Sequence, residues 1–206
     1  MVLSTKVKNR LMWWSIFLVS LGPFAWLFAQ ALLDNLGADP AKTLVIELGV
    51  WAINFLWITL AITPLRKFLN WKWLIKYRRM MGLYSFFYTM LHLLAFATFI
   101  VGWDLQILVI EITERPYAIV GFIALVLLLP LAVTSTKSMQ KRLKKHWLTL
   151  HKLVYPIAGL ALLHVVWQIR SDYGDALAYA VILAWLLGYR LYKKGKTIKK
   201  LAAPAK

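Results

Sequence analysis

This chain of 206 residues has no cysteine and few charged residues. It has no cysteine, which excludes disulfides, Fe–S clusters, thiolate ligation of heme, thiol catalysis and covalent heme attachment through a CxxCH motif. Charged residues make up only 16% of the sequence, against about a quarter in soluble domains. Acidic residues are the scarcer sign, with eight Asp and Glu against 25 Lys and Arg. This composition is typical of an integral membrane protein.

Hydrophobic residues account for 61% of the chain and gather in long blocks, each close to the roughly 20 residues that cross a bilayer. Because a backbone in lipid must satisfy its own hydrogen bonds, we expect every block to form a helix. The first block is too long for the core of a cleaved signal peptide, so we interpret it as a retained span. No internal repeat of fixed period is evident. The predicted spans are residues 11–33, 44–65, 80–102, 117–134, 153–169 and 176–192.

The fold class is therefore an all-α integral membrane protein with six transmembrane helices over residues 11–192, a short tail over 1–10 and a basic tail over 193–206. All but three of the basic residues fall in the N-terminal tail, in the second and fourth loops or in the C-terminal end from Arg190 onward, while all eight acidic residues lie on the opposite side or at its edge. By the positive-inside rule, both termini are cytoplasmic. The net charge of +17 is thus an orientation signal and does not indicate nucleic-acid binding. The exceptions are Lys42, Arg115 and Arg170.

One outer connection, WDLQILVIEITERPY over residues 103–117, is unusually apolar for a loop. We expect it either to lie along the membrane surface or to dock a partner.

Two histidines, His92 and His164, lie deep inside the third and fifth predicted spans. Imidazole is costly in hydrocarbon, so such residues indicate a functional site. With no cysteine and no paired membrane carboxylate, axial ligation of heme iron is the most economical use for them. Each lies about 17–18 Å from the cytoplasmic edge at 1.5 Å per residue. Their matched depth predicts that they ligate one b-type heme from opposite faces, in the interior of the bundle.

A third histidine, His151, lies on the cytoplasmic edge of the same span as His164. Thirteen residues separate the two, so on a straight helix they point about 140° apart, unless Pro156 distorts the helix. His151 could ligate a second heme, serve a quinone or flavin site, or be an interfacial residue. The fourth histidine, His146, lies in a lysine-rich loop and is interpreted as a solvated residue.

Heme propionates need cationic or hydrogen-bonding partners. Arg78, Arg79 and Lys152 are candidates for a cytoplasmic-side heme, and Arg115 and Arg170 for an outer one. Small residues allow close approach of helices or of a porphyrin ring. The candidates for this role are Gly82, Ala95, Gly121 and Gly159.

The rival interpretation is a cofactor-free small transporter or membrane assembly factor that uses the histidines for proton coupling or packing. Transporters usually carry discontinuous helices, repeats or membrane carboxylates, and none of these is clear in this sequence.

Several segments closely resemble one known family. The run RPYAIVGFIALVLLLPLAVTSTKSMQKRLKKHWLTLHKLVYPIAGLALLHVVW, with ITPLRKFL and KYRRMMGLYSFFYTMLHLLAF, is similar to the MsrQ (YedZ) family of the ferric-reductase-like transmembrane superfamily. The resemblance covers about residues 10–195. It implies a heme-binding subunit in the bacterial inner membrane that passes electrons from quinone or a cytosolic flavin reductase to a periplasmic molybdopterin methionine sulfoxide reductase.

The same resemblance assigns heme roles to His92, His151 and His164, and leaves His146 outside the pattern. Family members are described with b-type heme and with FMN, although no flavin motif is evident in this sequence. Ferric-reductase-like proteins often carry two histidines on each of two helices. The third span here has only one, so the number of hemes, one or two, stays open.

Overall fold

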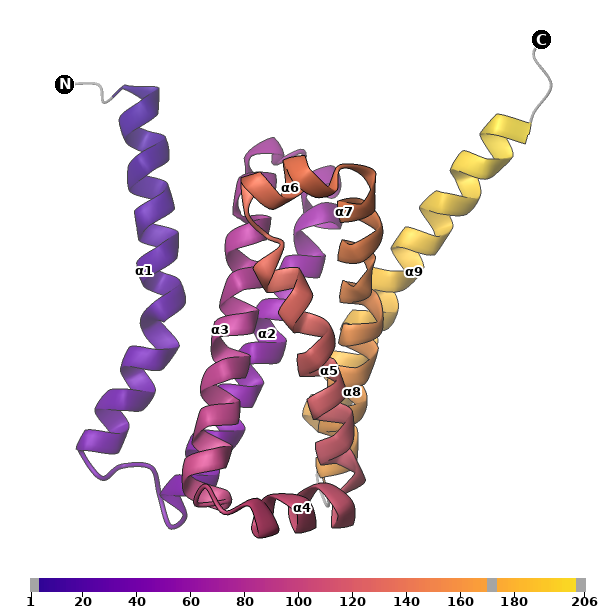
Figure 1. Ribbon diagram of the computed structural model, residues 1–206. Coiled ribbons are helices and arrows are strands. Elements are labelled where there is room, and N and C mark those ends of the chain that lie inside the picture. The colour runs from indigo at the N-terminus through magenta and orange to yellow at the C-terminus, as the bar shows by residue number, and fades with distance from the viewer. Residues whose placement is uncertain (1–3, 170–173, 203–206) are drawn as a thin grey trace.

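The computed structural model describes residues 4–169 and 174–202, and this part of the chain is helical with short connections. Six stretches are long and apolar enough to cross a membrane, which confirms the predicted architecture (Figure 1). They are formed by α1 (Thr5–Leu32), α2 (Pro40–Phe68), η1 with α3 and η2 (Lys72–Tyr77, Arg78–Ala95 and Phe96–Ile100), α5 (Pro116–Val133), α7 with η3 and α8 (Lys145–Leu150, His151–Leu153 and Val154–Gln168), and α9 (Gly174–Ala202).

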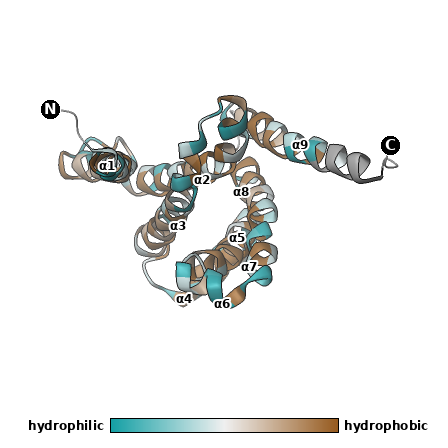
Figure 2. Ribbon diagram, turned by 90° about the horizontal axis from the view of Figure 1, so that it is seen from above, coloured by the Kyte–Doolittle hydropathy of each residue, from teal (hydrophilic) through white to brown (hydrophobic). Residues whose placement is uncertain are grey.

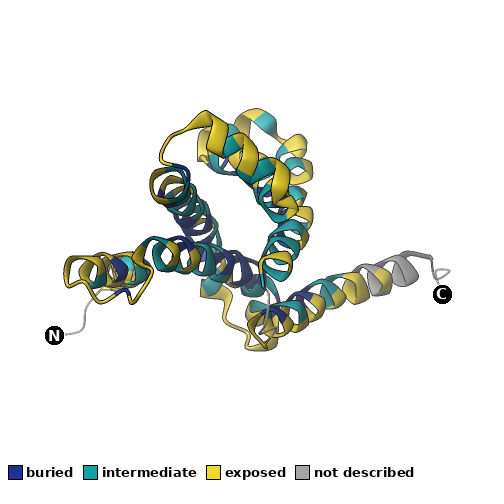
Figure 3. Ribbon diagram, turned by 90° about the horizontal axis from the view of Figure 1, so that it is seen from below, coloured by how far each residue is buried: buried dark blue, intermediate teal, exposed yellow. Residues whose placement is uncertain are grey.

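Helices α2, α3, α5 and α8 form the centre of the bundle, with α1 and α9 at its periphery (Figure 2). Helix α2 packs closely along α3, and α5 packs closely along α8. Within the apolar part of each helix, 50% of the residues of α2 are buried, but only 11% of those of α1. Buried positions gather along α2 and α3 in Figure 3, whereas exposed apolar side chains cover much of α1. This is the distribution expected when lipid, rather than water, surrounds the peripheral helices.

Two tyrosines of α3 attach α1 to the bundle through its backbone. The Tyr84 hydroxyl donates to the carbonyl of Phe17 at 2.6 Å. The Tyr88 hydroxyl, which is fully buried, donates to the carbonyl of Ser20 at 2.8 Å and accepts from the N–H of Phe24 at 3.1 Å. In a regular helix that N–H and that carbonyl would bond each other, so the hydroxyl is inserted between them.

The outer connection contains a helix of its own, α4 (Leu105–Glu114), which crosses the end of the bundle opposite the chain termini (Figure 1). It buries none of its residues, and Leu105, Val109 and Ile110 are among its exposed apolar side chains. Its direction across the spans and its exposed apolar residues favour a helix lying along the membrane surface. At the opposite end lies the short α6 (Lys137–Leu143).

The helix is irregular between His151 and His164, as a distortion by Pro156 would make it, but the irregularity does not lie at the proline. The irregularity between His151 and His164 is a 3₁₀ turn, His151–Leu153, and it precedes the proline. Pro156 is the third residue of α8, where the missing N–H is one that a helix start leaves unbonded in any case.

A second proline, Pro64, lies inside α2 and has a partner in α9. Because proline has no N–H, the carbonyl of Leu60, four residues earlier, loses its donor. The Arg190 guanidinium supplies a replacement, since its Nη2 donates to the Leu60 carbonyl at 2.6 Å. The same side chain donates from Nη1 to the carbonyl of Leu186 at 2.8 Å. A half-buried arginine thus ties α9 to the interrupted turn of α2.

We predict that Arg190→Met destabilises the protein by about 1–3 kcal/mol, because the Leu60 carbonyl is left without a donor. In a Pro64→Ala background, the restored N–H should bond that carbonyl, and the same Arg190→Met change should cost clearly less. The measurement is a double-mutant cycle of thermal stability in detergent. Equal costs in the two backgrounds would show that the arginine acts independently of the proline.

Candidate functional site

The structure brings His92 of α3 and His164 of α8 close together between the two central helix pairs. Their ring centroids are 6.2 Å apart and their planes are nearly perpendicular, at 86°. This proximity agrees with the matched depth that the sequence predicts. A metal–imidazole bond is about 2 Å long, so two imidazoles bound to opposite sides of one metal ion have centroids roughly 6 Å apart. The pair therefore has the spacing of trans ligands.

Each ring is held by one hydrogen bond to a helix backbone. The Nδ1 of His92 lies 2.7 Å from the carbonyl oxygen of Val45, and the Nδ1 of His164 lies 2.7 Å from that of Tyr117. Since a carbonyl only accepts, both Nδ1 atoms carry the proton and both Nε2 atoms keep a lone pair. Neither Nε2 has a hydrogen-bond partner among the described residues. In its neutral form, each ring with this hydrogen bond is the tautomer that metal-binding histidines commonly adopt.

Glycine makes these two hydrogen bonds possible. Gly49 lies four residues after Val45, and Gly121 lies four residues after Tyr117. A helix side chain leans toward the preceding turn, so a larger residue at either position would cover the carbonyl that the histidine reaches. A Cβ on Gly49 would lie 3.0 Å from the Nδ1 of His92, and one on Gly121 would lie 2.7 Å from the Nδ1 of His164. Both glycines are therefore part of the site.

The two halves of the site form an internal repeat that sequence inspection missed. In both, the histidine follows its carbonyl partner by 47 residues. The glycine also keeps the same place in each half, four residues after the carbonyl partner. Few residues between these positions are identical, so the signal is this shared spacing of glycine and histidine. Gly121 was expected from sequence as a small residue at a close approach, whereas Gly49 was not.

The pair suits a porphyrin better than a bare metal ion. Protein sites for bare transition metals take three or more side-chain ligands. Over residues 4–169 and 174–202, no group of three His, Asp or Glu could hold a metal ion. A porphyrin supplies four nitrogens itself and needs only the two axial positions filled.

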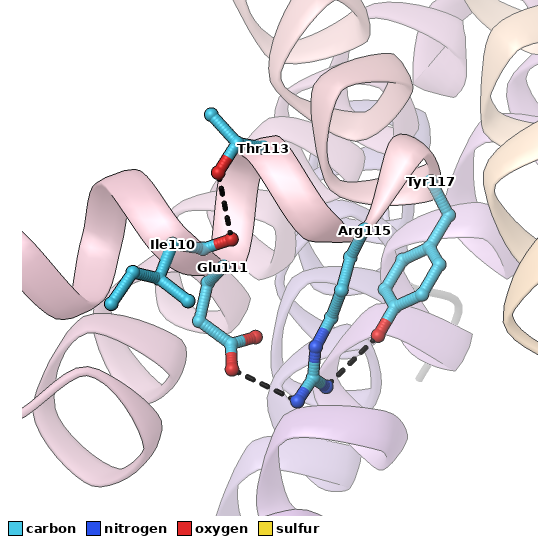
Figure 4. A network of polar contacts seen from close by, with 5 residues as sticks. All are labelled: Ile110, Glu111, Thr113, Arg115 and Tyr117. Atoms are coloured by element: carbon cyan, nitrogen blue, oxygen red, sulfur yellow. Dashed lines mark hydrogen bonds and ion pairs between the residues drawn. The ribbon is translucent and has the colours of Figure 1, made fainter.

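The outer end of the site is organised by Arg115, as Figure 4 shows. Its Nη2 lies 2.9 Å from the Glu111 carboxylate, and its Nη1 donates to the Tyr117 hydroxyl at 3.0 Å. The pKa of Arg115 is raised, first by the hydrogen bond to Tyr117. Electrostatic interactions with Tyr117, Glu111 and Glu114 raise it further. The guanidinium is therefore cationic throughout the physiological pH range.

A cavity of about 590 Å³ opens at this outer end, within the size range of small-molecule sites. Because the Tyr117 backbone also holds His164, the cavity and the histidine pair are adjacent. Arg115 uses two of its five donors on other described residues, so further donors face no described partner. The lining residues are Glu114, Arg115, Pro116, Tyr117, Trp167 and Gln168.

His151 has different contacts from the other two membrane histidines. Its Nε2 lies 3.1 Å from the Thr134 hydroxyl, which donates its own proton to the Pro130 carbonyl at 2.5 Å. The hydroxyl must therefore accept, and the His151 Nε2 carries the proton. Trp147 stacks on the ring at 4.0 Å and donates to the Thr134 carbonyl at 2.9 Å. Ligation through Nε2 would require His151 to give up this arrangement.

The other predicted residues are separated by the structure. Arg78 is half-buried and lies close enough to His151 to interact with it electrostatically, whereas Arg79 and Lys152 are exposed. His146 is exposed, as expected, but it lies in the short helix α7 and not in a loop. Arg170 lies outside the described residues.

Comparison with known proteins identifies close relatives. The sequence model of the family described as "Ferric reductase like transmembrane component" matches residues 48–172, a range that contains both glycine–histidine units. A protein of Polaromonas naphthalenivorans (strain CJ2) is 47% identical over 180 residues, covering 86% of this chain and 82% of its own. One of Xanthomonas euvesicatoria pv. vesicatoria (strain 85-10) is 49% identical over 170 residues, covering 82% and 78%. Both bear the name "Protein-methionine-sulfoxide reductase heme-binding subunit MsrQ". No solved structure matches significantly.

We predict that Gly121→Ala displaces His164, because the added methyl would overlap its ring, and weakens metal or heme retention on the order of tenfold. Gly49→Ala should have a smaller effect, since its Cβ lies at the limit of contact. Gly159→Ala in α8 is the matched control, because nothing lies within 4 Å of its added Cβ. Heme-to-protein ratios of the three purified variants provide the measurement. Equal ratios in Gly121→Ala and Gly159→Ala would contradict the role given to Gly121.

Proposed function

Because the chain belongs to the MsrQ family of ferric reductase like transmembrane components, we propose that it is the heme b membrane subunit of a bacterial methionine sulfoxide reductase system. It passes electrons from the quinone pool or a cytosolic flavin reductase to a periplasmic molybdopterin-containing reductase. That partner reduces methionine sulfoxide in oxidised envelope proteins. The chain is an oxidoreductase subunit of the inner membrane, and sulfoxide reduction occurs on the partner.

The observation that carries this proposal is the His92–His164 pair. Two neutral imidazoles, 6.2 Å apart and with both Nε2 atoms free of other partners in the described chain, fit the two axial positions of one heme. When bound, heme supplies an iron that takes up and releases single electrons. The residues of this chain hold the two rings in place, fix their tautomer and keep them away from bulk water.

The two backbone hydrogen bonds also influence the affinity of each imidazole for metal. A carbonyl that accepts from Nδ1–H increases electron density on the ring and makes Nε2 a better ligand. Val45 and Tyr117 lie on two different helices, so the two ligands are held independently of each other. His92 and His164 would therefore both stay in place to hold a heme, which would supply the electron-transfer chemistry.

The outer cavity suits the propionates of a heme held by the pair. Arg115, the Tyr117 hydroxyl and the Gln168 amide offer cationic and neutral donors there. Arg170 is proposed for the same task from sequence alone. On the opposite side, Arg78 and Arg79 are proposed for a cytoplasmic-side heme.

His151 is proposed either to ligate a second heme or to tune the site where electrons enter from the cytoplasm. Its bond to Thr134 and its stacking on Trp147 support the second role. FMN and quinone are proposed as cofactor and electron donor because of the resemblance to the family.

We predict that His92→Ala and His164→Ala each remove the same heme, because each takes away one of its two protein ligands. His146→Ala, at an exposed position of α7, should leave the spectrum unaltered and serves as the control. The measurement is a dithionite-reduced-minus-oxidised spectrum with a pyridine hemochrome assay on purified protein.

Two outcomes would count against the proposal. If one of the two membrane substitutions leaves heme content unchanged, the pairing is wrong. If the unsubstituted protein carries no heme after heme-sufficient expression, the histidines serve proton coupling or packing, as in a cofactor-free transporter or assembly factor.

A further inference from the structure

The predicted cytoplasmic end of the bundle contains a half-buried cation without a partner. Arg78 is the first residue of α3 and makes no hydrogen bond or ion pair with any described residue. It interacts electrostatically with Tyr155 of α8, Arg190 of α9 and His151. A guanidinium has five donors, and leaving them unpaired in a partly buried position costs free energy. Arg78 is therefore placed to receive an acceptor that the described chain does not supply.

A buried hydroxyl without a partner lies at the same level. The Thr63 Oγ1 is buried and makes no hydrogen bond within the described part of the chain. Helices α2 and α3 are antiparallel. A Cβ added to Gly82 would lie 3.6 Å from the Thr59 Cγ2. One turn further toward the cytoplasmic end on both helices, the residue facing Thr63 is Arg78. The two unpartnered donors thus share one level of the same helix pair.

Arg190 completes this group from α9. Its donors reach the carbonyls of Leu60 and Leu186, and Leu60 precedes Thr63 by less than one turn of α2. The Arg190 guanidinium also lies 5.3 Å from the centre of the Tyr155 ring. Two of its five donors are bonded to the carbonyls, so others remain available. The two arginines therefore share Tyr155 as a neighbour, and Thr63 lies within one turn of the α2 carbonyl that Arg190 bonds.

Among the described residues, no Asp or Glu acts on this group. All eight Asp and Glu lie in the outer connections or in the outer parts of the spans. The ion pair of Glu111 and Arg115 lies at the opposite end of the bundle. Two guanidinium charges close together at a membrane boundary repel each other unless an anion separates them. That anion must come from outside the chain.

We propose that Arg78, Arg190 and Thr63 bind a phosphate group at the cytoplasmic boundary of the membrane. A phosphate offers three or four acceptor oxygens and up to two negative charges, which matches two guanidinium groups and a hydroxyl better than one carboxylate does. The phosphate belongs either to a soluble phosphorylated cofactor or to a lipid headgroup. This site is independent of the His92–His164 pair, so each proposal can fail without the other.

Flavin mononucleotide and riboflavin form a matched pair of probes, because they differ only in the phosphate. The full-length heme-loaded protein is placed in nanodiscs of phosphatidylcholine, and binding is followed by flavin fluorescence. If the phosphate belongs to a soluble cofactor, we expect FMN to bind at least tenfold more tightly than riboflavin. Arg78→Gln should reduce the preference for FMN about tenfold, and Thr63→Val should reduce it several-fold. Lys76→Gln removes the same charge at an exposed position and should leave the preference unchanged.

The second arm tests the lipid source. Replacing part of the phosphatidylcholine by phosphatidylglycerol should raise the thermal midpoint of the unsubstituted protein and of Lys76→Gln. Arg78→Gln and Thr63→Val should lose most of this rise. Thr63→Val also controls for misfolding, because removal of an unpartnered buried hydroxyl should not lower stability by itself. The Soret spectra of Thr63→Val and Lys76→Gln confirm that the site of His92 and His164 is unchanged.

The proposal is supported if either arm separates Arg78→Gln and Thr63→Val from Lys76→Gln, and the arm that does so identifies the source. It is overturned if FMN and riboflavin bind alike and phosphatidylglycerol stabilises all four proteins equally. It is also overturned if Lys76→Gln has the same effect as Arg78→Gln, since that result reflects general surface charge.

Discussion

The hydrogen bond from a histidine Nδ1 to a helix carbonyl is the interaction on which the centre of this molecule depends. It occurs twice, at 2.7 Å each time, and in both cases it requires a glycine four residues after the carbonyl. Because the carbonyl can only accept, the bond decides which nitrogen of His92 and of His164 is left for a metal. The close packing of α2 on α3 and of α5 on α8 brings each histidine to its carbonyl.

Much of the fold could be predicted from hydropathy and charge alone. Six apolar blocks predict six spans, and the helical rise places His92 and His164 at one depth, since both spans start from the same side. The sequence could not predict which backbone group each imidazole would meet, because that depends on the register between two helices. Gly49 gives no sequence signal until Gly121 is seen at the same spacing from its own histidine.

The sequence also could not predict the tertiary contacts of Arg190 and His151. Arg190 was assigned to the basic C-terminal end as an orientation charge, yet it bonds the carbonyl that Pro64 leaves without a donor. His151 was expected as a ligand or an interfacial residue, and its bonding to Thr134 depends on a turn, His151–Leu153, that no local pattern indicates. In both cases a tertiary contact, rather than a local propensity, decides the role of the side chain.

The central claim is that His92 and His164 ligate one heme with their planes fixed by separate backbone hydrogen bonds. Electron paramagnetic resonance of the oxidised, heme-loaded protein tests it most directly, because the low-spin ferric signal reports the angle between the two axial imidazole planes. With an angle of 86°, the account predicts the strongly anisotropic low-spin signal of nearly perpendicular planes. A high-spin signal, or the rhombic low-spin signal of nearly parallel planes, would contradict it.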